Sequence, residues 1–197
     1  MFFRLSDLVA GILLGVGGLL AYTLLPRNAA LRAGVILSIC FAGLTALDSF
    51  LPLDCPATSD PACRAAEEAN LVSWQHQLHN LTGALEGALA PVALLLIAIG
   101  LWQLRRRGTL PEQWEGVWQS LVIMGLTYAV FSGAIAVLYT DRLDGVGLWQ
   151  RVQIVLYCAA MFTLGLAMRQ YREPPVRTAA AHAQLSGGHG DRPGGLS

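Results

Sequence analysis

The residues best suited to chemistry lie in one segment, LVSWQHQLHNLTGALEGALAP. Ser73, His76, His79, Gly83 and Glu86 recur in it at spacings of three, three, four and three, so a helix places them on one face. That face carries two imidazoles and a carboxylate into an otherwise apolar stretch. Ionisable groups within a membrane segment usually face the interior of the helix bundle and mark functional sites. We therefore predict that His76, His79 and Glu86 line a binding site.

Three further charged residues are expected at a similar depth. Asp48 lies near the end of the second apolar stretch, Asp54 lies just beyond it, and Arg151 lies near the start of the last one. Together with the histidines and Glu86, they predict an outward-facing polar pocket that binds a lipid or another small ligand. For Asp48 and Arg151 the alternative is a polar network that only fixes the register of the helices, and both interpretations stay open.

The same residue types are also compatible with a metal site. Neutral histidines and carboxylates bind zinc, so His76, His79 and Asp48 could supply three ligands and leave an open position for water. A metal-bound water would suit hydrolysis of a lipid amide or ester. The His-x-x-His spacing is much less specific than a full HExxH motif. Without metal, the two imidazoles could bind a lipid headgroup or respond to pH.

Membrane helices must position these residues. The chain is 54% hydrophobic and 13% charged, whereas about a quarter of the residues in a soluble domain are charged. A crossing needs roughly 20 apolar residues in a helix, because lipid cannot pair exposed backbone groups. Five stretches meet this need, at about 8–25, 33–53, 81–104, 117–139 and 148–168. We predict an all-α, polytopic bundle of about five transmembrane spans.

The predicted bundle occupies residues 1–172 and includes an extracytoplasmic loop at about 54–74. Residues 173–197 begin with Glu-Pro-Pro and become rich in glycine, which predicts a disordered cytoplasmic tail. Gly11 and Gly15 in the first span are typical of close packing between helices.

Arginine placement predicts the orientation. Arginines concentrate in the first and third connections and after the last span, which the positive-inside rule makes cytoplasmic. The N-terminus and the long second loop then lie outside, in an orientation expected for a bacterial plasma membrane. Cys55 and Cys63 would face an oxidising compartment there, so we favour a disulfide over two free thiols.

The expected partners follow from charge and hydropathy. The chain has 13 basic and 13 acidic residues, and this balance gives no reason to expect nucleic-acid binding. Membrane lipid is the expected partner, with a homo-oligomer as a further option.

Several motifs resemble the prokaryotic multi-pass membrane proteins of the domain of unknown function 998 family. They are FLPLDC, DPAC, SWQHQLH and the GLWQR that begins the last span. The resemblance covers residues 1 to about 170, and its matching positions are Pro52, Asp54, His76 or His79, and Arg151. It implies a membrane bundle and supports the choice of site residues, but it implies no activity. Members of that family commonly have six spans, which implies either that the start of this chain is truncated or that the family's first helix is dispensable, and both alternatives stay open.

The leading hypothesis is an uncharacterised membrane protein with an outward-facing polar pocket for a lipid or small ligand. One alternative is a metal-dependent intramembrane hydrolase, for which a looser similarity of Ser73, His76 and Asp48 to the zinc site of the alkaline ceramidase superfamily is an analogy. Another is a small transporter or proton-coupled channel, which would need polar residues that converge at the centre of the membrane. Whether the protein is an enzyme is left open.

Overall fold

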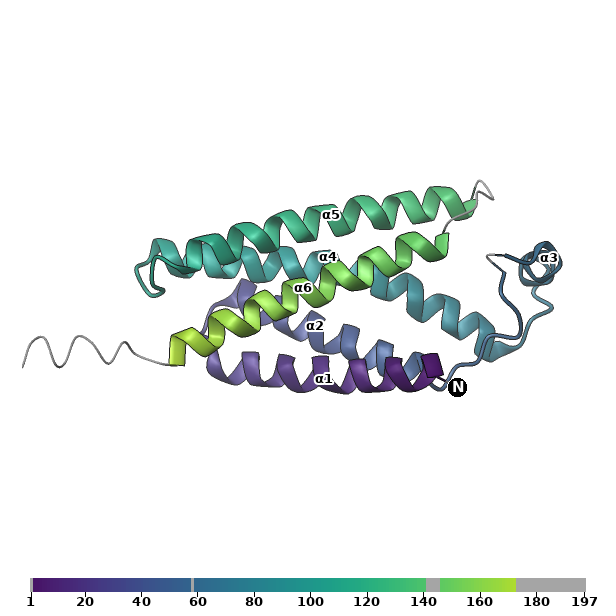
Figure 1. Ribbon diagram of the computed structural model, residues 1–197, viewed down its shortest axis with the longest axis horizontal. Helices are drawn as coiled ribbons and strands as arrows, with labels where there is room; N and C mark the ends of the chain where they lie inside the picture. Colours follow the sequence, from purple (N-terminus) through teal and green to yellow (C-terminus); the bar gives the residue numbers. More distant parts are fainter. Residues whose placement is uncertain (1, 58, 141–145, 173–197) are drawn as a thin grey trace, which may run out of the picture.

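The structure, a computed structural model, describes residues 2–57, 59–140 and 146–172. The described residues form helices joined by loops, which confirms the predicted all-α class (Figure 1). In chain order the helices are α1 (Phe2–Leu24), α2 (Ala29–Asp48), α3 (Pro61–Glu68), α4 (Trp74–Arg106), α5 (Trp114–Thr140) and α6 (Val146–Arg172).

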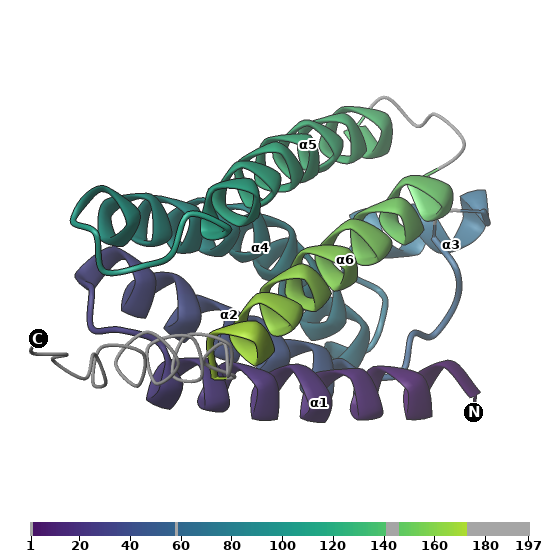
Figure 2. The same cartoon turned by 60° about the vertical axis from the view of Figure 1, so that its left-hand side comes forward.

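Five of these helices, all except α3, are long and apolar enough to cross a membrane. They pack in sequence, α1 on α2, α2 on α4, α4 on α5, and α5 on α6, so that α4 lies at the centre (Figures 1 and 2). We call the end that carries α3 the disulfide end. The opposite end, with Arg27, Arg32 and Arg105, is the arginine end. The predicted five-span bundle is therefore confirmed.

Helix α4 is longer than the predicted span because it begins seven residues earlier. Ser73 caps its N-terminus by accepting the backbone N–H of His76 at 3.3 Å. At 1.5 Å per residue its 33 residues extend about 50 Å, well beyond a hydrocarbon core of about 30 Å. Its first turns therefore carry His76 and His79 toward the disulfide end.

The second span was predicted to end five residues too late. Helix α2 ends at Asp48, and the backbone N–H of its C-cap residue, Ser49, donates to the Leu47 carbonyl. Pro52 disfavours helical geometry at the preceding residue, so the apolar run FLPL is a loop rather than helix. Asp48 is thus the last residue of α2.

Helix α3 was missed in the sequence, which predicted only a loop. Asp60 caps it by accepting the Ala62 N–H at 2.9 Å, and Pro61 occupies its first position. Asp followed by Pro is a common start of a helix. The Cys55–Cys63 disulfide is confirmed and ties this short helix to the chain that leaves α2.

Glycines let α2 and α4 pack closely in the middle of the bundle. A Cβ at Gly34 would lie 2.7 Å from the Ala93 carbonyl oxygen, and one at Gly100 would lie 2.5 Å from the Leu31 amide nitrogen. Around this contact the core is apolar and fully buried, as at Leu94 and Ile97. The predicted tail, residues 173–197, lies outside the described residues.

Candidate functional site at the disulfide end

Two groups of polar side chains lie at the disulfide end, where α1 begins, α2 ends and α4 begins (Figure 1). The loop cluster consists of Asp54, Ser73 and His76. The acid cluster consists of Asp7, Asp48, His79, Thr82 and Glu86.

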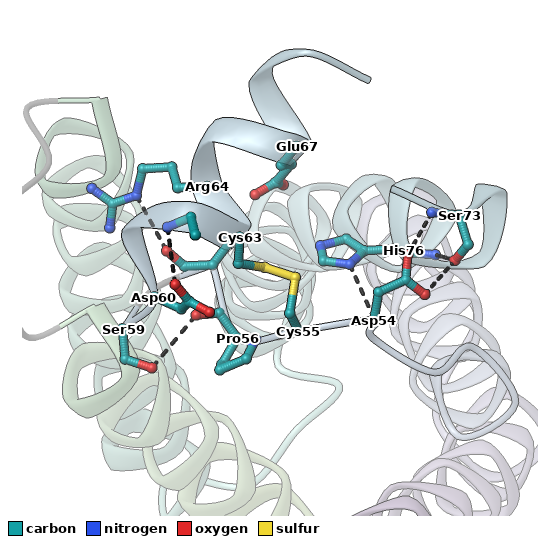
Figure 3. The surroundings of a disulfide bond; sticks show 12 residues. Asp54, Cys55, Pro56, Ser59, Asp60, Cys63, Arg64, Glu67, Ser73 and His76 are labelled. Carbon is teal, nitrogen blue, oxygen red and sulfur yellow. Dashed lines mark hydrogen bonds between the residues drawn. A yellow bond between two sulfur atoms is a disulfide. The ribbon is translucent and has the colours of Figure 1, made fainter. Parts of the chain in front are cut away.

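The loop cluster fixes the disulfide loop to the start of α4 (Figure 3). The Asp54 carboxylate accepts the Ser73 backbone N–H at 2.5 Å and the Ser73 hydroxyl at 2.7 Å. The Asp54 backbone N–H in turn donates to Nδ1 of His76 at 3.2 Å. Because His76 is 1% exposed, its imidazole is part of the packing between the loop and α4.

The hydrogen bonds to Asp54 favour the ionised form of its carboxyl group. The backbone N–H and the hydroxyl of Ser73 stabilise its charged form and lower the pKa of the Asp54 carboxyl, with a smaller contribution from His76. An ionised Asp54 also lies at the N-terminus of α4, where a negative charge interacts favourably with the helix dipole.

The acid cluster joins α2 to α4. The Thr82 hydroxyl donates a hydrogen bond to Oδ1 of Asp48, and Nδ1 of His79 lies 3.7 Å from the same oxygen. Thr82 is 2% exposed, and the Asp48 side chain is 10% exposed. The His79 side chain, at 31%, remains accessible from the disulfide end.

Glu86 and Asp7 complete the acid cluster. Glu86 lies two turns further into α4 beside Thr45, within electrostatic range of both Asp48 and Asp7. Among the described residues, its Oε1 is buried and has no hydrogen-bond partner. Asp7 reaches the same region from α1 and interacts with His79 and Asp48.

A third polar contact lies next to Glu86 and joins α4 to α5 and α6. Gln153 of α6 donates to the Ser132 hydroxyl of α5 at 2.6 Å, and that hydroxyl donates to the Gly87 carbonyl of α4 at 3.0 Å. These bonds join three helices at the depth of Glu86.

The structure divides the predicted site residues between different groups. His76 contacts Asp54, whereas His79 faces Asp48, so the two imidazoles have separate partners. Arg151 is exposed on α6, and within the described residues Asp48 pairs with Thr82 and His79 instead. No group of three or more His, Cys, Asp or Glu side chains in the described part of the chain is arranged to hold a metal. Zinc bound by His76, His79 and Asp48 stays a prediction without such a cluster.

Sequence reasoning missed Asp7 and Thr82. For Asp7 a signal was present, because it lies one helical turn before Gly11. A Cβ at Gly11 would lie 2.7 Å from the Ala42 carbonyl oxygen, so that face of α1 packs on α2 and directs Asp7 into the bundle. For Thr82, nothing in the sequence indicated an interhelical bond.

Comparison with known proteins places the chain only at the level of a family. A family model described as a protein of unknown function, DUF998, matches residues 1–167. No curated protein and no solved structure matches the chain.

Proposed function

This chain belongs to the DUF998 family of proteins of unknown function. Because membership in this family indicates no activity, we propose a function from the chemistry of the acid cluster. The protein binds an ammonium group, carried by a small molecule or a lipid headgroup, at the disulfide end of its membrane bundle. The observation that carries this proposal is the convergence of Asp7, Asp48 and Glu86 from three helices, with His79 beside Asp48.

The hydrogen-bonding groups of the cluster support a cationic ligand. Asp7, Asp48 and Glu86 interact electrostatically, and Nδ1 of His79 lies 3.7 Å from Asp48. Arg4 lies one turn before Asp7, but its Nε–H donates to the Ser49 carbonyl at 2.5 Å. An ammonium group would place a positive charge among these carboxyl groups and supply a donor for Oε1 of Glu86, which has no hydrogen-bond partner among the described residues.

The packing beyond Glu86 supports a site that opens to one side only. The next turns of α4 bury Ala90, Ala93, Leu94 and Ile97 almost completely. A transporter needs polar groups that continue across the membrane, and this apolar layer interrupts them. We therefore favour binding over transport.

The distribution of charge and the disulfide support an outward-facing site. Arginines gather at the opposite end, as expected for a cytoplasmic face. The Cys55–Cys63 bridge is stable in an oxidising compartment outside the cytoplasm. The acid cluster would then meet ligands from outside the cell or from the outer leaflet.

Thermal unfolding of the purified full-length protein in detergent tests the proposal. Ethanolamine represents the free cation with its N–H donors, choline supplies the charge without an N–H donor, and phosphatidylethanolamine represents the headgroup. A ligand at 100 times its Kd should stabilise the protein by about 2.7 kcal/mol. Asp48→Asn/Glu86→Gln should abolish this shift. The matched control, Glu112→Gln/Glu115→Gln, changes two exposed carboxylates at the arginine end and should preserve it.

A shift with choline or ethanolamine alone would identify a free cation, and a shift only with phosphatidylethanolamine would identify the headgroup. If none of the three probes raises Tm, or if the Asp48→Asn/Glu86→Gln protein responds like the control, the proposal is wrong.

A further inference from the structure

We propose that the groove between α1 and α6 binds the acyl chains of an anionic phospholipid, with its headgroup at the arginine end. This site is separate from the acid cluster, which lies at the other end of the bundle and would take a cation.

The groove exists because α1 and α6 scarcely touch along most of their length. Helix α1 packs on α2, while α6 packs on α5 and approaches α1 toward the C-terminal ends of both helices (Figures 1 and 2). The space between them has a volume of about 900 Å³. Binding sites for small molecules commonly measure about 300–1,000 Å³.

The walls of the groove suit hydrocarbon. Leucine, alanine, glycine, methionine and phenylalanine side chains make up most of them, and Ser38 and Arg169 are the polar residues that line it. The Ser38 hydroxyl already donates to the Gly34 carbonyl at 3.1 Å. Leu13, Leu20 and Phe162 at the rim are exposed, so the groove opens toward lipid.

The length of the groove suits lipid chains. Along α1 the lining runs from Ala10 to Leu24, which is about 21 Å at 1.5 Å per residue. One leaflet contributes about half of a hydrocarbon core of about 30 Å. Acyl chains that extend from a headgroup at the arginine end can therefore lie along the groove.

Charge complementarity identifies the headgroup. Arg169 lines the groove at the arginine end, and Arg27 is exposed three residues after Leu24, the last residue of α1. The Arg32 guanidinium lies 5.0 Å from the ring of Tyr22, which places a third cation beside the last turn of α1. Guanidinium groups form strong, charge-assisted hydrogen bonds with phosphate. An anionic phosphatidylglycerol-type headgroup matches this end better than a zwitterionic one.

Two glycines that line the groove allow it to be blocked by substitution. A Cβ at Gly17 or Gly165 would meet nothing within 4 Å, although both residues lie in the groove. Leucines at these positions would add bulk to the groove, and their Cβ atoms would meet nothing within 4 Å. Gly43 and Gly133 have equally open surroundings and do not line the groove, so Gly43→Leu/Gly133→Leu is the matched control.

The experiment is native mass spectrometry of the full chain after incubation with equal amounts of phosphatidylglycerol and phosphatidylcholine. Wild type should retain phosphatidylglycerol preferentially. Gly17→Leu/Gly165→Leu should retain about tenfold less lipid than the control, which corresponds to about 1.4 kcal/mol. Arg169→Gln leaves the walls in place and should reduce the preference for phosphatidylglycerol about tenfold, whereas Arg107→Gln, an exposed arginine outside the groove, should not.

Equal retention by the groove and control variants would overturn the proposal, as would a wild-type protein with no preference between the two lipids. Light scattering tests the other occupant. If wild type is a dimer that only Gly17→Leu/Gly165→Leu dissociates, the groove is an interface between two copies, and the lipid proposal is wrong.

Discussion

Asp54 and Ser73 illustrate how single residues hold the disulfide end together. Each contributes to the other's role, because Ser73 caps α4 while its N–H and hydroxyl bind the Asp54 carboxylate. The same aspartate positions His76 through its backbone N–H. The contacts among these three residues therefore fix the position of the loop relative to the first turn of α4.

Asp54→Asn should make the protein less stable at neutral pH, and this effect should disappear in acid. The pKa of Asp54 is lowered from its ordinary value of 3.8, so its ionised form stabilises the fold above about pH 3.8. This contribution is lost as the pH falls through the lower pKa of the folded state. Thermal unfolding of both proteins between pH 7 and pH 3 should show Tm values that converge at the acid end. A difference in Tm that is independent of pH would contradict the prediction.

Thr82→Val tests the bond between α2 and α4 in the acid cluster. Valine has nearly the same shape as threonine but cannot donate to Asp48, whose side chain is only 10% exposed. We expect a loss of about 1–2 kcal/mol in the free energy of unfolding. This value lies between the average energy of an interhelical hydrogen bond in a membrane and that of a hydrogen bond to a charged group.

Thr163→Val is the control for this substitution. Within the described residues, the Thr163 hydroxyl bonds to the Ala159 carbonyl of its own helix, at 2.8 Å. Its loss should change stability by less than about 0.5 kcal/mol. Both effects are measured by denaturant unfolding in detergent. If the two substitutions reduce stability equally, the bond to Asp48 contributes no more than a bond within one helix, and the prediction is wrong.

At the scale of the elements, hydropathy predicts the helices well because each crossing needs one long apolar run. It does not predict where a helix continues beyond the membrane, since the first turns of α4 are polar and are held by the Ser73 cap. It also overlooks α3, whose eight residues contain no apolar run.

The partners within the site were harder to predict for a related reason. Hydropathy gives the depth of a residue but not the direction in which its side chain points around the helix. Asp48 and Arg151 both lie toward the disulfide end of the bundle, yet Asp48 faces α4 while Arg151 is exposed on α6. Helix packing decides this, and glycines such as Gly11 were the available clue.

Gly34→Ala should separate α2 from α4. Its new methyl group would lie 2.7 Å from backbone atoms of Ala93 and Ile97, which can move only if the helices move apart. We expect a loss of about 1–3 kcal/mol. Gly43→Ala adds the same methyl group to α2 where nothing lies within 4 Å. It should increase stability by about 0.5–1 kcal/mol, because alanine is the better helix former. Thermal unfolding that ranks the two variants in the opposite order would contradict this packing.

At the scale of the whole molecule, the two ends of the bundle differ in chemistry. The disulfide end holds carboxylates and histidines between its helices, whereas arginines gather at the opposite end, beyond the buried apolar core. A cation site and an anionic-lipid site at opposite ends would both follow from this polarity. Each proposal therefore depends on which end faces the cytoplasm.

We expect the disulfide end to lie outside the cytoplasm and the arginine end inside it. The test uses single cysteines in a Cys40→Ala/Cys158→Ala background, with Ala69→Cys in the disulfide loop and Gln113→Cys between α4 and α5; both positions are exposed. A membrane-impermeant maleimide applied to intact cells should label Ala69→Cys and leave Gln113→Cys unlabelled. After lysis it should label both. Labelling of Gln113→Cys alone in intact cells would reverse the orientation, because arginines would then face outward against the positive-inside rule. The acid cluster would then face the cytoplasm, and its ligand would be sought among cytoplasmic cations.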